Sequence, residues 1–127
     1  MKLSKNFSKS EFECNCGCKM PSDVFENVKE LAKNLQVIRD AVGKPLHLTN
    51  AYRCKEHNKK VGGSKNSQHI LGKAGDIKSI FITPRSLFKK IEGMIDKSLI
   101  SEGGLGKYKT FTHYDIRGTK ARWNNEK

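Results

Sequence analysis

Apolar residues recur at helical spacing in two segments of the chain. The first segment begins at Ser22, which can cap a helix, and its apolar residues follow at steps of three and four until Gly43, a typical C-terminal stop. The second covers residues 83–99, where Thr83 is the expected cap and Pro84 occupies the first turn. The first stripe consists of Val24, Val28, Leu31, Leu35, Ile38 and Val42, and the second of Leu87, Ile91 and Ile95. We expect the first stripe to pack into the core and to carry no chemistry.

Shorter runs with the spacing of strands lie between these helices and after them. Residues 46–53 alternate apolar and polar side chains after Pro45, and residues 74–82 form a second run. Residues 103–108 and 111–117 are joined by a short turn, which is typical of an antiparallel hairpin. The sequence therefore predicts about four short strands.

The predicted fold is an α+β domain with a small, largely antiparallel sheet and two main helices. Residues 55–64 are expected to form a helical turn that ends in a glycine loop. Residues 1–21 are expected to be irregular, apart from one helical turn near residues 8–12. Because the 127 residues contain no repeat or linker, the whole chain, 1–127, is interpreted as one domain.

The composition limits the possible classes of protein. Hydrophobic residues make up 35% and charged residues 30%, which is typical of a globular protein rather than a disordered one. No apolar run approaches the roughly 20 residues that span a bilayer, so membrane insertion is not expected. The start of the chain has no apolar signal-peptide region, so we expect synthesis in the cytoplasm without a signal peptide.

The formal net charge of +12 favours an anionic partner. Nucleic acid, an anionic membrane surface and a phosphate-rich bacterial wall all meet this condition. The lysines are spread over every segment, and the sequence has no helix-turn-helix signature, aromatic–basic RNA motif or Cys/His finger spacing. Nucleic-acid binding therefore rests on charge alone, and we do not expect it.

Four cysteines fall in two places: Cys14, Cys16 and Cys18 lie in the stretch "CNCGC", and Cys54 lies far downstream. The C-x-C-x-C spacing differs from the C-x-x-C pairs of zinc ribbons. Free thiols, a structural metal site and a disulfide to Cys54 all stay open. Because the cysteines cluster in only two places, we expect Cys54 to lie beside at least one of the other three.

The stretch "NSQHILGKAGD" places His69 and Asp76 seven positions apart. Gly72 and Gly75 are expected to let the chain fold back so that the two side chains can meet. His113, in the last predicted strand, is a third candidate. Two histidines and one carboxylate are typical of hydrolytic zinc sites, in which three protein ligands leave a fourth position for water. Imidazole and carboxylate also suit zinc better than calcium or magnesium.

Three motifs occur in order along the chain. The first is "AYRCKEHNKKVGG", which is similar to the pattern "GYR-x-x-x-x-N-x-x-VGG" of the family named below. The second, "S-x-H-x-x-G-x-A-x-D", consists of Ser67, His69, Gly72, Ala74 and Asp76, and the third is "H-x-D" at 113–115. Over roughly residues 28–123 the chain thereby resembles the zinc D-alanyl-D-alanine peptidase family. This family includes carboxypeptidases, vancomycin-resistance dipeptidases and phage endolysins, and it shares its fold with the hedgehog signalling domain.

The resemblance implies a hedgehog-like fold and one catalytic zinc ion. His69, Asp76 and His113 match the zinc ligands of the family. Arg53 matches the arginine that holds a substrate carboxylate or the developing oxyanion, and Ser67 matches a serine that lines the substrate pocket. A guanidinium suits the first role because it can pair with a carboxylate through two parallel hydrogen bonds.

The chain departs from the family at the general base. The dipeptidase and endolysin members carry a glutamate three residues before the last histidine, and Thr110 stands at that position here. Asp115 is predicted to share a strand face with His113 and to act as the catalytic base or to orient a ligand, and both roles stay open. Glu102 is a poorer candidate because it precedes a glycine turn. Trp123 is expected in the core.

These features predict a zinc metallopeptidase that hydrolyses peptide bonds of bacterial peptidoglycan stem peptides. Whether it is a D-Ala-D-Ala carboxypeptidase or an endolysin-type endopeptidase stays open. We expect a monomer that acts on the cell wall after phage or prophage release. The alternative is a non-catalytic, zinc-containing module of the same fold that binds the cell wall, and the missing glutamate favours it.

Overall fold

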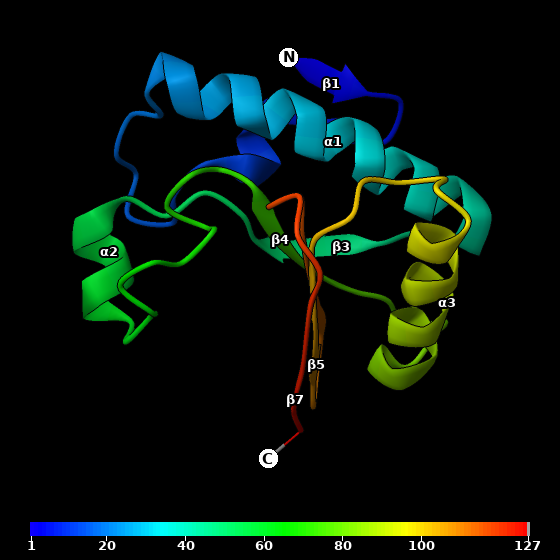
Figure 1. Ribbon diagram of the computed structural model, residues 1–127. Helices are drawn as coiled ribbons and strands as arrows, with labels where there is room; N and C mark the ends of the chain where they lie inside the picture. Colours follow the sequence, from blue (N-terminus) through cyan, green and yellow to red (C-terminus); the bar gives the residue numbers. More distant parts are fainter. Residues whose placement is uncertain (127) are drawn as a thin grey trace.

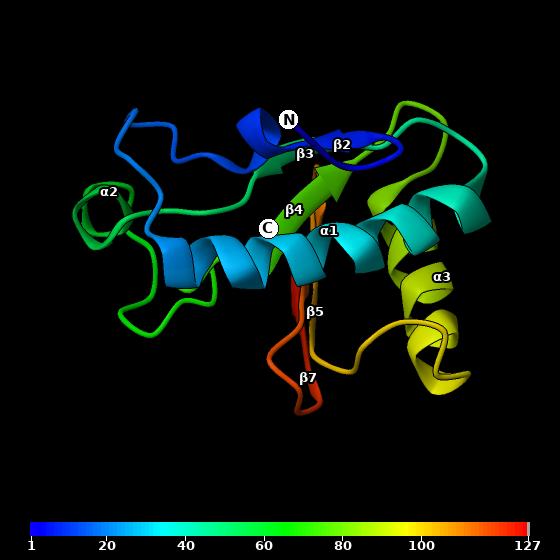
Figure 2. The same cartoon turned by 90° about the horizontal axis from the view of Figure 1, so that it is seen from above.

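A mixed five-stranded sheet forms the centre of the computed structural model, which describes residues 1–126 (Figure 1). Its strand order is β3-β4-β6-β5-β7. The strands are β3 (His47–Asn50), β4 (Ala74–Lys78), β5 (Gly104–Tyr108), β6 (Thr112–Asp115) and β7 (Ala121–Asn125). Helix α1 (Ser22–Val42) crosses above the sheet, and α3 (Pro84–Asp96) contacts α1, β5 and β6 (Figures 1 and 2). This arrangement confirms the predicted α+β fold with two main helices.

The directions of the strands make the sheet largely antiparallel. Every neighbouring pair is antiparallel except β5 and β7, which are parallel. The hairpin of β5 and β6 confirms the prediction for residues 103–117. Strand β7 is not predicted, because the two apolar residues in its sequence "ARWNN" are too few to indicate a strand. Its pairing depends instead on the turn at Gly118, where a φ of 92° lets the chain return alongside β5.

Helix α1 begins differently from the expectation and ends as expected. Pro21 rather than Ser22 occupies the N-cap position, and Ser22 is the first helical residue. The pyrrolidine ring fixes the φ of Pro21, here −64°, and with a ψ of 155° the residue is extended and precedes the first turn without a side-chain cap. Gly43 ends the helix in the left-handed region, at φ 71°, and its N–H donates to the carbonyl oxygen of Arg39. The predicted apolar stripe is buried, apart from the partly buried Val42.

The remaining short elements lie around the ends of this framework. Thr83 caps α3 as predicted, since its hydroxyl oxygen accepts a hydrogen bond from the Ser86 N–H. Helix α2 (Lys55–Lys60) matches the helical turn expected in residues 55–64. No helix within residues 1–126 combines the length and the apolar character needed to cross a membrane.

The N-terminal segment contains more regular structure than predicted. Strands β1 (Lys2–Ser4) and β2 (Phe7–Ser8) form a small hairpin, and the 3-10 helix η1 (Lys9–Phe12) confirms the expected turn. The hairpin corrects the irregular assignment of residues 1–21. Its physical basis is packing, because the buried rings of Phe7 and Phe12 meet edge to face with centroids 6.2 Å apart.

The register of β4 and β6 separates the core from the opposite face of the sheet. Gly75 pairs with Tyr114, and a Cβ at Gly75 would meet Leu35 of α1, so this pair faces the helices. Asp76 pairs with His113, and because successive strand residues alternate, this pair faces away from α1. Two potential ligands therefore lie side by side on the face that α1 leaves uncovered.

Candidate metal centre

Strands β4 and β6 and the loop before β4 bring His69, Asp76 and His113 together. All three are buried, and their candidate ligand atoms lie within 4.8 Å of one another. The His69 Nε2 lies 3.3 Å from the Asp76 Oδ2, and the His113 Nδ1 lies 3.0 Å from the Asp76 Oδ1. The structure therefore places the three predicted ligands around one point.

The two glycines before Asp76 have different roles. Gly72 reverses the chain with a φ of 73°, as expected for a fold-back. Gly75 is not a turn residue, which corrects the expectation that both glycines fold the chain back. It lies in β4, and a Cβ there would stand 3.0 Å from the Cδ1 of Leu48. Gly75 therefore serves close packing against the core.

Hydrogen bonds define which nitrogen of each imidazole is available as a ligand. The Nδ1 of His69 lies 2.7 Å from the carbonyl oxygen of Ala51, which only accepts, so this nitrogen carries the proton. The Nε2 of His113 donates in the same way to the Asp115 carboxylate, at 2.7 Å. The remaining nitrogens both face Asp76: they donate to its carboxylate when protonated and offer lone pairs to a cation when they are not. Such outer hydrogen bonds are the usual way of orienting histidine ligands.

The donor set fits a zinc ion. Two imidazole nitrogens and a carboxylate converge, and when both histidines are neutral in these tautomers all three groups offer lone pairs that a cation between them would engage. Three protein ligands are the usual number in catalytic zinc sites, where a fourth position serves water or substrate. The single carboxylate is too few oxygen ligands for calcium.

The electrostatic environment keeps Asp76 ionised. Burial alone would raise the pKa of Asp76, but hydrogen bonds from His113 and His69 outweigh it and lower the pKa to about 2. Burial would likewise lower the pKa of His113, but the hydrogen bonds to Asp115 and Asp76 raise it. The carboxylate is thus available as an anionic ligand near neutral pH.

Asp115 contacts His113 at Nε2, the ring nitrogen that does not face Asp76. Asp115 is fully buried, and its Oδ1 accepts from the backbone N–H of Gly104 at 2.8 Å. Arg117 donates to both carboxylate oxygens, from Nε at 2.9 Å and from a terminal nitrogen at 2.7 Å. Burial would raise the pKa of Asp115, but the hydrogen bonds from Arg117 and His113 hold it well below its usual range. Both oxygens are therefore engaged by groups of the protein.

Replacing Gly104 by alanine is expected to destabilise the fold. A Cβ at this position would meet the Asp115 carboxylate and would stand 2.8 Å from a terminal nitrogen of Arg117. We expect Gly104→Ala to lower the free energy of unfolding by about 1–3 kcal/mol, measured by urea denaturation. Gly93→Ala on α3 is the matched control, because a Cβ there meets nothing within 4 Å. Equal stability of the two variants would contradict the close packing of Asp115 against β5.

The triad lines a cleft of about 690 Å³. The predicted substrate residues Arg53 and Ser67 line the same cleft. Among its lining residues, within the described part of the chain, Asp76 is the single carboxylate. Thr110, at the position of the family glutamate, is exposed in the turn between β5 and β6. Neither Asp115 nor Glu102 lines the cleft.

Trp123 is a cleft residue that the sequence interpretation placed wrongly in the core. It is half-buried, lines the cleft and has its ring centroid 5.0 Å from that of His113. Its indole N–H donates to the Tyr108 hydroxyl at 3.0 Å. Pairing aligns Trp123 with Gly106 and His113, and a Cβ at Gly106 would meet the indole ring. The glycine is the sequence signal for this packing, but it has meaning only once the register of β7 is known.

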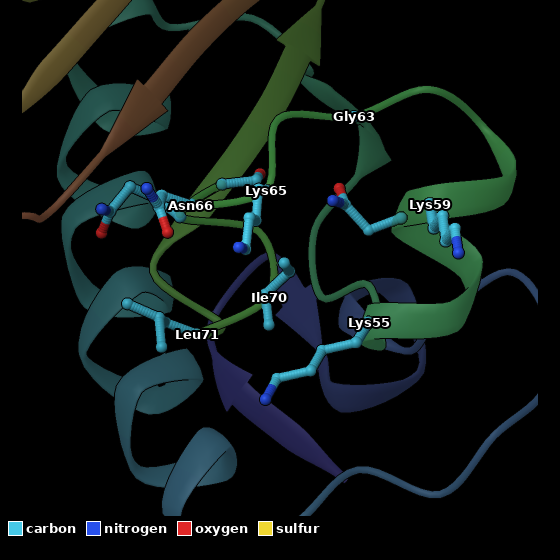
Figure 3. Close-up of a pocket in the computed structure, with 10 residues that line it drawn as sticks. Lys55, Lys59, Gly63, Lys65, Asn66, Ile70 and Leu71 are labelled. Carbon is cyan, nitrogen blue, oxygen red and sulfur yellow. The ribbon is translucent and has the colours of Figure 1, made fainter.

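A second hollow adjoins the cleft, with which it shares Gly63, Asn66, Ser67 and Gln68 as lining residues. It has a volume of about 870 Å³, and Lys55, Lys59 and Lys65 are among its lining residues (Figure 3). It contains none of the three ligand candidates. The hollow therefore places the positive charge of three lysines next to the cleft.

A buried set of two histidines and one aspartate on an α+β scaffold is typical of proteins that hold a hydrolytic metal ion. Residues 5–115 match the family model described as peptidase M15, so this chain belongs to the M15 family of zinc D-alanyl-D-alanine peptidases. A search of curated proteins finds no match. Family membership confirms the resemblance seen in the motifs and supports a zinc-dependent metallopeptidase.

Proposed function

We propose that the protein is a zinc peptidase that hydrolyses peptide bonds in the stem peptides of bacterial peptidoglycan. The observation that carries this proposal is the convergence of His69, Asp76 and His113 in a cleft that also contains Arg53. Within that class, it acts as a D-Ala-D-Ala carboxypeptidase or as an endolysin-type endopeptidase. The net charge of +12 and the lysine-lined hollow support an anionic cell wall as the setting, reached at phage or prophage release.

The roles of the buried residues follow from their contacts. His69, Asp76 and His113 would hold zinc, which supplies a Lewis acid for the scissile carbonyl and an activated water. The Ala51 carbonyl holds the His69 ring in place through Nδ1. Asp115 is proposed as a positioning residue for His113, rather than as the base, because it is fully buried and bonded to Arg117 through both oxygens.

Arg53 is proposed to bind the substrate carboxylate or the developing oxyanion. It is half-buried, and its Nε is buried without a hydrogen-bond partner among the described residues. The backbone N–H of Arg53 donates to the His69 carbonyl oxygen at 3.0 Å, and this bond holds the backbone of Arg53 beside the triad. A guanidinium that lines the cleft with an unsatisfied nitrogen favours an anionic ligand there, which would pair with its charge. Ser67, whose hydroxyl oxygen accepts from the His69 N–H, adds a polar group to the same wall.

Replacing Arg53 by lysine is expected to damage catalysis although the charge is kept. An ammonium group lacks the planar fork of a guanidinium and cannot pair with an anion in the same two-point geometry. We expect kcat/KM to fall on the order of tenfold or more, at unchanged zinc content. Arg85→Lys is the matched control, since Arg85 is exposed and pairs with Glu126 on the surface. Equal activity of Arg53→Lys and the wild type would remove Arg53 from the site.

The proposal is tested on defined substrates. The purified protein is incubated with a stem peptide that ends in D-Ala-D-Ala and, separately, with cross-linked peptidoglycan, and the products are identified by mass spectrometry. Release of D-alanine would identify a carboxypeptidase, and cleavage within the cross-links would identify an endopeptidase. Either activity should disappear with a chelator and return with zinc. Absence of both products from the zinc-loaded protein would overturn the proposal.

The alternative function, a zinc-containing module that binds the cell wall without cleaving it, rests on one observation. Among the lining residues described, the cleft offers no carboxylate besides Asp76, which is itself a ligand candidate. Sedimentation with intact peptidoglycan without any product would favour this module. Turnover in the assay above would exclude it.

A further inference from the structure

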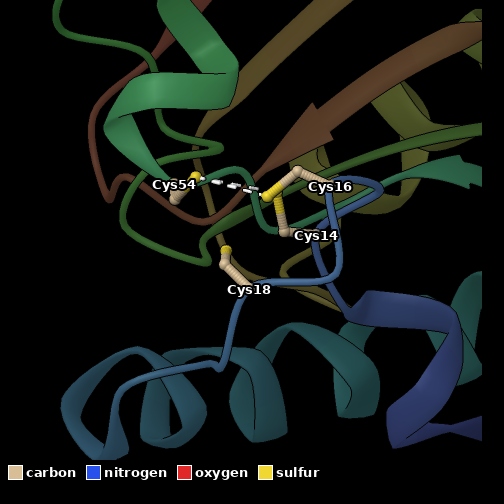
Figure 4. A group of neighbouring side chains, drawn as sticks. All are labelled: Cys14, Cys16, Cys18 and Cys54. Atoms are coloured by element: carbon tan, nitrogen blue, oxygen red, sulfur yellow. Dashed lines mark hydrogen bonds between the residues drawn. The ribbon is translucent and has the colours of Figure 1, made fainter.

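The four cysteines of the chain meet at one point, outside the cleft. Their sulfur atoms lie within 4.8 Å of one another, and all four point toward a common centre (Figure 4). Cys14, Cys16 and Cys18 come from the segment between η1 and α1, and Cys54 is the N-cap residue of α2. This confirms the expectation that Cys54 lies beside at least one of the other three. None of them lines the cleft of the His–Asp–His triad.

We propose that Cys14, Cys16, Cys18 and Cys54 bind a second metal ion, a structural zinc. The Sγ–Sγ distances are 3.2 Å for Cys14–Cys16, 3.6 Å for Cys16–Cys54 and 3.9 Å for Cys14–Cys54. A tetrahedral zinc site with Zn–S bonds of about 2.3 Å has sulfurs about 3.8 Å apart. The sulfurs therefore already stand near the corners of such a tetrahedron.

The number of converging sulfurs decides between a metal and a disulfide. All four cysteines are free, and a single disulfide would leave two thiols in contact without a function. Two disulfides would require one of them to join two cysteines of the closely spaced C-x-C-x-C run. A four-cysteine zinc site uses all four. It also explains the C-x-C-x-C spacing, in which Gly17 turns the chain at a φ of 84° and donates its N–H to the Cys14 carbonyl oxygen at 3.0 Å. That turn brings Cys18 back toward the sulfurs of Cys14 and Cys16.

The ligand type selects zinc and a structural role. Four thiolates form a soft donor set, which binds zinc in preference to calcium or magnesium. A shell of four protein ligands is closed and leaves no position for water or substrate. The backbone N–H of His57 donates to the Cys54 sulfur at 3.4 Å, which is the kind of outer hydrogen bond that stabilises a thiolate ligand.

The position of the site shows what the metal would hold together. Two residues before Cys54, the N–H of Tyr52 donates to the carbonyl oxygen of Phe12 at 3.0 Å, so the two segments already touch. Arg53 lies between Tyr52 and Cys54 in the chain. Ala51, which precedes Tyr52, orients His69 through its carbonyl oxygen. An ion at the cysteines would clamp the N-terminal segment to this strand end. It would thereby fix the backbone that supports both Arg53 and His69.

The test is the metal content of the full chain, purified under reducing conditions and loaded with zinc. We expect two zinc ions per chain in the wild type and one in Cys16→Ser, in which the exposed cysteine is replaced. Asn15→Ala is the matched control: it removes the hydrogen bond from Asn15 to Asn50 in the same loop but no sulfur, and it should keep both ions. Cobalt substitution gives a second readout, since a thiolate site adds an intense near-ultraviolet charge-transfer band that Cys16→Ser should lose.

The wild-type protein alone is also decisive if the variant fails to fold. When its thiols are titrated with a mercurial reagent, all four should react together and one zinc ion should be released. Four thiols that alkylate equally fast with and without zinc would overturn the site, and so would a disulfide found in the native protein. These outcomes are independent of the peptidase proposal, because the two ligand sets share no residue. A wall-binding protein without turnover could still carry the cysteine-bound ion.

Discussion

Replacing His113 by alanine is expected to abolish peptide hydrolysis and to remove the zinc ion held by the His–Asp–His triad. His113 is one of three candidate ligands, and its Nδ1 lies 3.0 Å from the Asp76 Oδ1. Loss of a residue that merely supports a ligand already costs about 10–100-fold in metal affinity or activity, so loss of a ligand should cost at least about a hundredfold. Metal analysis and turnover of the D-Ala-terminated peptide measure the two effects.

His47→Ala is the matched control for this experiment. His47 is exposed at the start of β3 and belongs to neither cluster of candidate ligands. It should keep full zinc content and full activity. Because His113 is buried, circular dichroism should first establish that the His113 variant is folded, and His113→Asn, with less loss of volume, serves as a second variant. A folded variant that keeps the triad's zinc ion would contradict the assignment of His113 as a ligand.

Replacing Asp115 by asparagine is expected to weaken zinc binding rather than to block proton transfer alone. The amide keeps the shape of the carboxylate, but it cannot accept from Arg117 through both positions. His113 would then lose the charged partner that holds its Nε2–H at 2.7 Å. We expect zinc affinity to fall about 10–100-fold, with turnover restored in part by added zinc.

The same variant separates the two roles that the sequence leaves open for Asp115. If Asp115 were the general base, zinc affinity would stay normal and turnover would fall about a hundredfold or more at saturating zinc. Glu102→Gln is the matched control, because Glu102 pairs with Arg122 and lies outside the cleft. Normal zinc affinity together with normal turnover of Asp115→Asn would exclude both roles. A large loss in Glu102→Gln would identify Glu102 as the base.

The local sequence determines the main helices, their ends and the candidate ligands, because each of these features depends on residues that are close together in the chain. The apolar stripe of α1, the Thr83 cap and the left-handed stop at Gly43 each involve residues within a few positions of one another. The candidate ligands are also readable, since imidazole and carboxylate groups lie in ordered motifs. Even the face of the strand on which Asp76 lies, together with the residues two positions away, follows from the alternation of a single strand.

Tertiary structure decides the features that depend on strand register and on packing between distant segments. Burial of Asp115 depends on the close approach of β5 at Gly104, and the cleft position of Trp123 depends on the parallel pairing of β7. Cys14 and Cys54 meet because the N-terminal segment packs beside the end of β3, about 40 positions away along the chain. No local pattern encodes these contacts, because side chains from separate segments come together only when the sheet has formed and its two faces have been assigned.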